Sequence, residues 1–313
     1  MTATQPVALV TGASSGIGQA ATLALAGAGF QVAGTSRNAS RVTPRDGVTF
    51  LDLDVTSDES VTTVVGQVIK RFGRIDVLVN NAGIGSAGAA EELSVAQDQK
   101  VFDINVFGVI RMTKAVLPHM RAQGGGRIIN ISSVAGFAPQ PHMAVYVASK
   151  HAVEGYSESV DHEVREQGIR VLLVEPANTS TGFDANMVRA DTPLPVYAQQ
   201  RHDFDEIMAA AMKDGDNPAV VARAIVAAAT DPNPKLRYTA GPRAGRASAR
   251  CAASPPPGSS TSRSARSTTW PADAPPARTP PVSGPAGDGS QRPVVTAESA
   301  HPIPGAAAKP RNS

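Results

Sequence analysis

Short apolar runs alternate with segments of helical periodicity along residues 1–240 of this chain of 313 residues. The apolar runs, which predict strands, cover residues 7–10, 31–35, 48–53, 77–80, 127–132 and 170–175, and residues 238–240 begin a seventh. Helical patterns cover residues 18–28, 57–72, 97–122, 146–167 and 217–229. Near-continuous apolar strands separated by helices predict a mainly parallel, seven-stranded sheet with helices on both faces. The sequence therefore predicts an α/β, doubly wound fold, whose ligands bind beyond the carboxyl ends of the strands.

Three glycines, Gly12, Gly16 and Gly18, follow the first predicted strand and precede the first predicted helix. Glycines in this position allow a tight turn and leave backbone N–H groups facing outward. The N-terminus of the following helix then attracts the pyrophosphate of a dinucleotide. Because these glycines stand between a strand and a helix, they predict a Rossmann-type dinucleotide site more strongly than a glycine run alone would.

Tyr146 and Lys150 stand four residues apart at the start of a predicted helix, so they share one face of it. A free tyrosine has a pKa near ~10. A lysine ammonium about 4 Å away, at an effective dielectric of about 20, favours the phenolate by about 4 kcal/mol, or roughly three pKa units. The pair therefore predicts a tyrosine able to act as a general acid or base. Such pairs are also common on ordinary helix surfaces, so this prediction depends on the other motifs.

Five separated motifs agree in identity and spacing with the short-chain dehydrogenase/reductase family. They are the glycine-rich turn at residues 11–18, the segments 80–83 and 105–108, a serine after the fifth strand, and the pair at 146 and 150. The chain resembles this family from about residue 5 to residue 240, and looks closest to its hydroxysteroid-dehydrogenase-like branch.

The resemblance implies that Asn105, Ser133, Tyr146 and Lys150 form the catalytic set. Ser133 is preferred to the adjacent Ser132 because the family serine stands thirteen residues before the tyrosine. The implied reaction interconverts a carbonyl and a secondary alcohol, with a proton from the tyrosine and a hydride from the nicotinamide. In the family the serine binds the substrate oxygen, the lysine also holds the ribose, and the asparagine orders a water.

A different class of function, a non-catalytic dinucleotide-binding sensor, would keep the glycine-rich turn. It would have no reason to keep the four catalytic residues together. A nucleic-acid-binding adaptor would depend on the basic tail described below, which has almost no aromatic residues for stacking on bases. We therefore expect an oxidoreductase that acts on a small molecule and binds no nucleic acid.

The end of the second strand predicts which dinucleotide is preferred. Sites for NAD usually place an acidic residue there to bind the ribose 2′-hydroxyl, but this chain has Ser36 followed by Arg37. An arginine bound to a 2′-phosphate contributes about 1.5–3 kcal/mol, so we expect NADP(H) to be favoured. The further cofactor contacts, from the glycine-rich turn and from the resemblance, are Ser14, Ser15, Ile17, Asp54, Val55, Asn81, Ala82, Gly83, Pro176 and Thr181, together with the three glycines, Tyr146 and Lys150.

Residues 182–211 contain no firm strand pattern but carry several large apolar residues. In the family this region closes over the substrate, and here it contains Phe183, Met187, Leu194, Tyr197 and Met208. Together with Phe137 and Met143 they indicate either a mainly apolar substrate pocket or core packing. His142 and His151 lie near the catalytic stretch, and no residues have metal-ligand spacing, so no metal is expected.

No apolar run approaches the ~20 residues that span a bilayer, and no signal-peptide pattern is present. Cys251 is the single cysteine, which excludes an internal disulfide and suits a reducing cytoplasm. We therefore expect a cytoplasmic protein without a membrane partner. The resemblance implies a homo-oligomer, although no ordered C-terminal segment of the kind that helps assembly is evident.

The sequence divides into a catalytic domain at residues 1–240 and a tail at residues 241–313. The tail has a net charge of +6 and contains 14 of the 25 prolines, with no apolar periodicity, whereas residues 1–240 have a net charge of −4. Such a composition predicts disorder, because too little surface can be buried to offset the entropy of ordering. A segment rich in Ala, Arg, Pro, Gly and Ser is also what a GC-rich gene yields when read out of frame. A frameshift product, an inert terminus and a basic binding tail all remain open.

Overall fold

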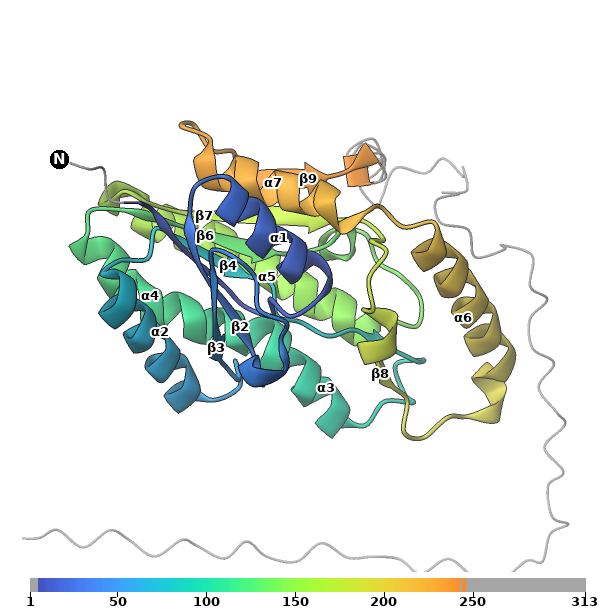
Figure 1. Cartoon of the computed structure of the whole chain (residues 1–313). Coiled ribbons are helices and arrows are strands. Elements are labelled where there is room, and N and C mark those ends of the chain that lie inside the picture. The colour runs from blue at the N-terminus through green and yellow to red at the C-terminus, as the bar shows by residue number, and fades with distance from the viewer. Residues whose placement is uncertain (1–4, 243, 246–313) are drawn as a thin grey trace, which may run out of the picture. The chain divides into compact units, whose positions relative to one another are not determined.

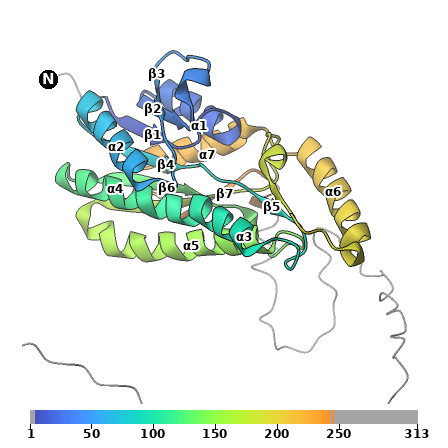
Figure 2. The same cartoon turned by 90° about the horizontal axis from the view of Figure 1, so that it is seen from below.

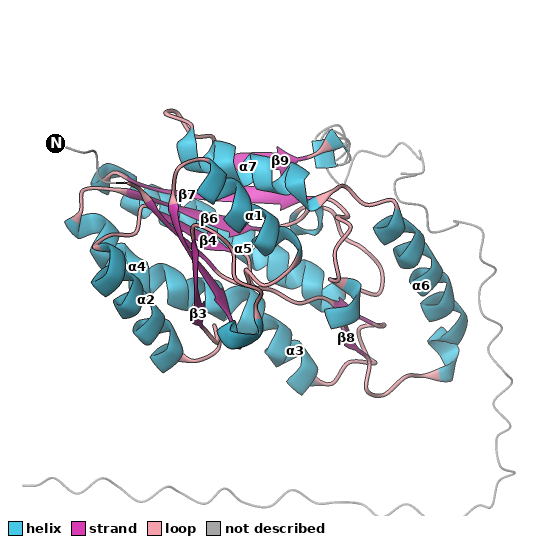
Figure 3. Ribbon diagram, in the orientation of Figure 1, coloured by secondary structure: helices cyan, strands magenta, loops and turns pink. Residues whose placement is uncertain are grey.

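A seven-stranded parallel sheet forms the centre of the protein in the computed structural model, which describes residues 5–242, 244 and 245 (Figures 1 and 3). Its strands are β1 Val7–Val10, β2 Gln31–Ser36, β3 Val48–Asp52, β4 Val77–Asn80, β6 Gly126–Ile131, β7 Ile169–Pro176 and β9 Arg237–Ala240. They lie in the order β3-β2-β1-β4-β6-β7-β9, and every pair is parallel. The predicted doubly wound fold is confirmed, with strand ends that differ from the predicted ones by two residues at most.

The strand order reverses between β1 and β4. From β1 the chain proceeds outward to β2 and β3, then returns to form β4 on the other side of β1. Val10, the last residue of β1, pairs with Gly34 of β2 on one side and with Val79 of β4 on the other. In doubly wound sheets the crevice at such a reversal is where ligands bind. The glycine-rich turn follows Val10 directly and so opens at this crevice.

Helices cover both faces of the sheet (Figures 1 and 2). They are α1 Gly16–Gly27, α2 Asp58–Phe72, α3 Val95–Phe102, α4 Gly108–Ala122, α5 Ala144–Val164, α6 Ala198–Lys213 and α7 Pro218–Thr230. Helices α1 and α7 pack on one face, where Leu25 and Ile225 meet Val10 and Ile129. Helices α2, α4 and α5 pack on the other face, against alternate residues of the same strands. Because both faces are buried, the strands are apolar at nearly every position, as predicted.

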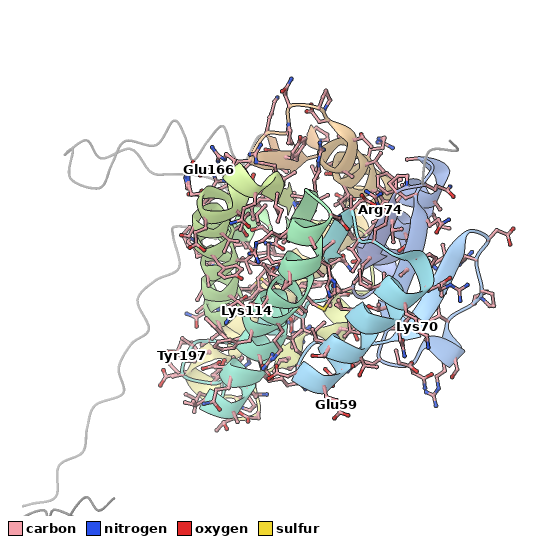
Figure 4. The ribbon with its side chains drawn as sticks, turned by 90° about the vertical axis from the view of Figure 1, so that its left-hand side faces the viewer. Glu59, Lys70, Arg74, Lys114, Glu166 and Tyr197 are labelled. Carbon is pink, nitrogen blue, oxygen red and sulfur yellow. The ribbon has the colours of Figure 1, made fainter. Side chains whose placement is uncertain are left out.

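Helix α2 shows how the sequence sets the limits of an element. Ser57 accepts a hydrogen bond from the Ser60 N–H at 3.2 Å and caps the helix start. Asp58 and Glu59 stand in the first turn and Lys70 in the last, which matches the helix dipole. Gly73 ends the helix with a φ of 78°, a conformation that favours glycine. Figure 4 shows the exposed side of α2 and α4, where Glu59, Lys70 and Lys114 lie.

One predicted helix contains a turn of a different helix type. Residues 97–122 were expected to form a single helix, but α3 and α4 are separated by a five-residue π-helical turn, η2 Asp103–Phe107. Apolar periodicity does not reveal such a turn, because a single five-residue turn is too short to stand out from the helical pattern on either side of it. The connection between β2 and β3 contains a single short turn, η1 Ala39–Arg41.

Two features of residues 182–213 were not predicted. The first is a two-residue strand, β8 Val188–Arg189, which pairs in parallel with another two-residue strand, β5 Ser86–Ala87, outside the main sheet. Helix α6 follows and lies beside the sheet, at the end where β5 stands (Figure 2). Only Phe204 and Met212 of α6 are buried, so its sequence lacks the broad apolar face that identifies a core helix.

The chain continues past β9 for a short distance within the described residues. Gly245 donates a backbone hydrogen bond to Gly241 at 3.1 Å, and Ala244 is buried. Apart from residues 241, 242, 244 and 245, the predicted tail lies outside the described residues, and so does the prediction of disorder or of a frameshift.

Candidate active site

A cleft of about 1300 Å³ lies at the carboxyl ends of the strands. All the predicted cofactor-contacting residues line it except Gly18, and of the predicted catalytic residues Ser133, Tyr146 and Lys150 line it. Predicted residues as far apart in the sequence as Gly12 and Thr181 are therefore gathered at one site, because the ends of parallel strands meet at one edge of the sheet.

The glycine-rich turn is tied to the segment after β4. Thr11 Oγ1 accepts the N–H groups of Asn81 and Ala82 at 2.9 and 3.0 Å, and Asn81 Nδ2 donates to the Thr11 carbonyl at 2.9 Å. The role of Thr11 was not predicted, although it begins the glycine motif. A Cβ on residue 18 would lie 2.1 Å from the Gly12 carbonyl oxygen, which is too close for any side chain. The turn can therefore adopt this conformation only because residue 18 is a glycine. The cradle is thus narrow and rigid, which suits a pyrophosphate at the start of α1.

Ser133 and Tyr146 meet in the cleft. Ser133 follows β6, and its hydroxyl donates to the Pro176 carbonyl at 3.4 Å and lies close enough to the Tyr146 hydroxyl to lower the pKa of that group. The Ala135 N–H donates to Ser133 Oγ at 3.1 Å and holds the serine in place. The adjacent Ser132 also lines the cleft, but it is buried and makes no side-chain hydrogen bond within the described part of the chain. The choice of Ser133 over Ser132 stays a prediction.

Tyr146 and Lys150 are both buried on the first turns of α5. Burial raises the pKa of Tyr146 to about 12, and its hydrogen bond with Ser133 opposes this rise. Burial lowers the pKa of Lys150 to about 8, against the attraction of Glu154. Lys150 Nζ donates to the Ile131 carbonyl at 2.8 Å and lies 5.7 Å from the Tyr146 ring centre. The decrease in the tyrosine pKa expected from a lysine about 4 Å away is thus not present in this arrangement, where desolvation dominates.

Asn105 stands in the π-helical turn η2 and is 1% exposed. Its Oδ1 accepts the Ile84 N–H at 2.9 Å, while Nδ2 donates to the Ile84 carbonyl and to Ser149 Oγ at 2.9 and 3.1 Å. The side chain therefore binds the segment after β4 to α5, close to Tyr146. This structural role and the participation of Ser149 were not predicted. The side-chain groups that could order a water are engaged with the protein.

The far end of the cleft lies beyond β2 and β3. Arg37 is exposed there, and Asp54 and Val55 line the same part. Hydrogen bonds from Thr56, together with the positive charges of Arg37 and Arg111, hold the pKa of Asp54 below its usual value. Arg111 was not predicted as a site residue. It lines the cleft and pairs with Asp58 and Asp103, both at 2.7 Å.

The opposite end of the cleft is bounded by apolar side chains. Tyr146 packs with Met143, Phe183, Met187 and Phe204, and its ring meets that of Phe183 edge-on at 5.6 Å. Met143, Phe183, Met208 and Met212 line the cleft, whereas Phe137, Leu194, Tyr197, His142 and His151 do not. The sequence left open whether these apolar residues form a substrate pocket or pack in the core. In the structure Met143, Phe183 and Met208 line the cleft, whereas Phe137, Leu194 and Tyr197 do not.

The comparisons with known proteins agree with this geometry. Residues 6–192 match the family described as short chain dehydrogenase, and the chain belongs to this family. It is 39% identical over 243 residues to a 3-ketodihydrosphingosine reductase of Bacteroides thetaiotaomicron, covering 75% of this chain and 88% of the relative. It is 35% identical over 258 residues to retinol dehydrogenase 8 of Homo sapiens, covering 76% and 82%.

Solved structures are similar over the same region. A short-chain dehydrogenase from Streptomyces avermitilis has a TM-score of 0.72 and 35% identity, with 79% of this chain and 92% of that chain covered. ElxO with NADP bound and a 3-ketoacyl-(acyl-carrier-protein) reductase from Brucella melitensis complexed with NADH each have a TM-score of 0.64, with 26% and 25% identity. They cover 75% of this chain and 97% and 96% of their own chains.

The protein is therefore an oxidoreductase that acts on a carbonyl or alcohol group with a nicotinamide dinucleotide. The hydroxysteroid-dehydrogenase-like branch stays a prediction. Among the described residues, no helix is long and apolar enough to cross a membrane, and no group of three or more His, Cys, Asp and Glu could hold a metal ion.

Proposed function

We propose that this protein is an NADP(H)-dependent reductase of apolar ketones or aldehydes, with Tyr146 as the proton donor. The meeting of the Tyr146 and Ser133 side chains in one cleft, at the point where the cofactor cradle meets the apolar wall, is the observation that carries this proposal. A carbonyl oxygen bound between these two hydroxyls would present its carbon toward the cradle. The reaction class follows from the hydroxyl pair, and the substrate class follows from the wall.

Each residue has a distinct task in this mechanism. When bound, the nicotinamide supplies or accepts the hydride. Ser133 donates a hydrogen bond to the carbonyl oxygen, and Tyr146 transfers its proton to that oxygen as negative charge develops there. The raised pKa of Tyr146 keeps it protonated near neutral pH, which suits reduction. Lys150, held by Ile131, then lies close enough to stabilise the phenolate that the transfer leaves behind.

The preference for NADP(H) rests on the end of β2. Ser36 stands where an acidic residue would bind the 2′-hydroxyl of NAD, and its Oγ accepts the Asn38 N–H at 3.3 Å. Arg37 is exposed beside the same part of the cleft, where its guanidinium can bind a 2′-phosphate. We expect NADPH to bind at least roughly tenfold more tightly than NADH.

The apolar substrate class rests on Met143, Phe183, Met208 and Met212. Three of these are methionines, whose flexible side chains adapt to ligands of different shape. The names of the two relatives, a reductase of 3-ketodihydrosphingosine and a dehydrogenase of retinol, are consistent with a substrate of this class.

Tyr146→Phe tests the catalytic assignment. This change removes the hydroxyl but keeps the ring that packs against Phe183, so the cleft should keep its shape. Turnover of a panel of ketones and aldehydes, followed by the loss of NADPH absorbance, should disappear. Cofactor affinity, measured by fluorescence titration, should stay within a few-fold. Turnover near the wild-type rate would show that Tyr146 is not the acid.

Arg37→Ala tests the cofactor assignment. Removal of the guanidinium should eliminate most of the difference in affinity between NADPH and NADH, because only the 2′-phosphate distinguishes the two. Arg41→Ala is the matched control, since Arg41 is an exposed arginine on η1 that does not line the cleft. Equal affinities for the two cofactors in the wild-type protein would contradict the proposal.

A further inference from the structure

Glu92 is a fully buried carboxylate close to the apolar end of the cleft, with 0% exposure. Its Oε2 accepts the Ala89 N–H at 2.8 Å, and its Oε1 accepts the Leu194 N–H at 2.8 Å. Arg201 also donates to Oε1, and the same Arg201 nitrogen donates to the Leu194 carbonyl at 3.0 Å. These hydrogen bonds and the positive charge of Arg201 outweigh the cost of burial and hold the pKa of Glu92 below its usual value.

The partners of Glu92 belong to two different parts of the chain. Ala89 lies in the segment after β5, whereas Leu194 and Arg201 lie more than 100 residues later, in the segment of residues 183–213 that we call the cover segment. The cover segment contains β8 and α6, and it carries Phe183, Met208 and Met212 of the cleft wall. Glu92 therefore joins the cover segment to the body of the protein at a buried point.

Apart from its backbone hydrogen bonds, such as the pairing of β8 with β5, the other polar contacts between the cover segment and the body lie at the surface. Gln97 donates to the Arg189 carbonyl at 2.7 Å, and the Tyr197 hydroxyl donates to Glu91, which is exposed. Tyr197 lies at the edge of the molecule in Figure 4. Exposed contacts compete with water and contribute little, whereas removal of one partner from a buried ion pair leaves the other without compensation. The position of α6 thus depends on Glu92 far more than on Glu91.

Helix α6 has few other means of attachment. Most of its residues are exposed, and its buried Phe204 packs in the cluster that contains Tyr146 and Met143. A displacement of the 194–201 region would therefore move Phe204 and Met208 away from the catalytic tyrosine. The hydroxyl pair and the cofactor cradle would stay in place, because they are held by β6, α5 and the glycine-rich turn.

We propose that Glu92 is a positioning residue that fixes the cover segment, and that the wall so formed selects substrates with a long apolar group beside the carbonyl. The inference about substrate selection rests on the proposed function. The inference about the cover segment does not, so the two parts can be tested separately.

Glu92→Gln is the variant of choice, with Glu91→Gln as its matched control. Glutamine has nearly the same shape but replaces one acceptor oxygen with an NH₂ donor and removes the charge. At least one of the three donors at Ala89, Leu194 and Arg201 then loses its acceptor. Glu91→Gln makes the same chemical change one residue earlier, at an exposed contact to the same segment.

Amide hydrogen exchange of the full chain saturated with NADP⁺ tests the position of the cover segment. Glu92→Gln should accelerate exchange in residues 190–212 by about tenfold or more, while exchange in β1, β4 and β6 stays unchanged. Glu91→Gln should leave both regions unchanged. Unchanged exchange in the cover segment of Glu92→Gln would overturn the proposal. Equal acceleration throughout the sheet would also overturn it, because Glu92 would then stabilise the whole fold and not this segment.

Methyl ketones of increasing chain length test substrate selection. For undecanone, Glu92→Gln should lower kcat/KM by about tenfold to a hundredfold, chiefly through KM, whereas butanone, which is too short to reach the wall, should change by less than about twofold. Equal losses for both ketones would overturn the selection. If the wild-type protein reduces neither ketone, nor any other carbonyl offered with NADPH, the proposed function fails, and hydrogen exchange alone then decides whether Glu92 fixes the segment.

Discussion

Two adjacent hydroxyls at the end of β6 have different surroundings. Both line the cleft, but the Ser133 hydroxyl acts on the pKa of Tyr146, whereas Ser132 Oγ lies against Gly136, where an added Cβ would be 2.7 Å away. The difference arises because successive residues of an extended chain point to opposite sides.

Ser133→Ala should lower kcat by about a hundredfold, since it removes one donor to the developing oxyanion. Ser132→Ala provides the control, and it should leave kcat within a few-fold, because the buried Ser132 hydroxyl makes no side-chain hydrogen bond among the described residues and is not among the groups that shift the pKa of Tyr146. Steady-state rates with NADPH and one reducible ketone are sufficient for this measurement. A larger loss in Ser132→Ala than in Ser133→Ala would reverse the assignment.

Sequence reasoning identified the residues whose spacing is local and missed those whose partners are distant. Tyr146 and Lys150 were found because one turn of helix relates them. Glu92, Ser149 and Arg111 were missed, because each has a partner 44 or more positions away in the sequence. The burial that raises the pKa of Tyr146 was also not predictable, since it depends on Phe183 and Met187 arriving from the cover segment.

At the scale of elements, helix α1 contains two glycines, Gly18 and Gly27, whose surroundings are opposite. Gly18 leaves no room for a side chain, because a Cβ would lie 2.1 Å from the Gly12 carbonyl oxygen and 2.4 Å from Asn81 Nδ2. Gly27, at the other end of the same helix, has no atom within 4 Å of that position. The first glycine is required by packing, whereas the second is not.

Gly18→Ala should therefore distort the glycine-rich turn, lower the stability by about 1–3 kcal/mol and weaken cofactor binding. Gly27→Ala should instead raise the stability by up to about 1 kcal/mol, because alanine restricts the unfolded chain, and should leave cofactor binding unchanged. Urea unfolding and NADPH titration of both variants provide the measurement. Unaltered NADPH affinity in Gly18→Ala would mean that the turn tolerates a side chain and does not form the close cradle described above.

Elements were predictable where their apolar pattern reports a buried face. The strands of the main sheet and helices α1, α2, α5 and α7 have such patterns. Most of their predicted ends lie within two residues of the ends in the structure. The π-helical turn η2 and helix α6 were not, because the first is only five residues long and the second buries only Phe204 and Met212. Both pack near Tyr146, so sequence patterns were least informative beside this part of the cleft.

At the scale of the whole fold, the last strand joins the sheet through a cluster of charges. Arg237 of β9 lies 3.1 Å from Glu175 of β7 and 3.2 Å from Glu154 of α5, and it also pairs with Glu158. Glu175 is 2% exposed and Glu154 is 7% exposed. One arginine thus faces two buried carboxyl groups.

Glu175 should make the stability of the fold depend on pH. Burial, and then repulsion from Glu154, raise the pKa of Glu175 to about 7 from an ordinary value of 4.5, while the hydrogen bond from Thr239 opposes the rise. The folded state therefore binds this proton more tightly than the unfolded state. Below the unfolded pKa both states are protonated and the group contributes nothing. As pH rises from about 4.5 to about 7, the free energy of unfolding decreases, and the penalty is complete above that window.

Glu175→Gln removes this penalty, since glutamine is neutral at every pH. Between about pH 5 and about pH 8 the stability of the variant relative to wild type should increase by about 2 kcal/mol, which shifts the melting temperature by roughly 4–8 °C in a domain of this size. Thermal unfolding of both proteins across this pH range provides the measurement. Glu158→Gln is the control, because Glu158 shares Arg237 but is 40% exposed, and its pH dependence should follow that of wild type. A constant difference between Glu175→Gln and wild type at all pH values would show that Glu175 is ionised in the folded protein throughout, with Arg237 compensating its charge.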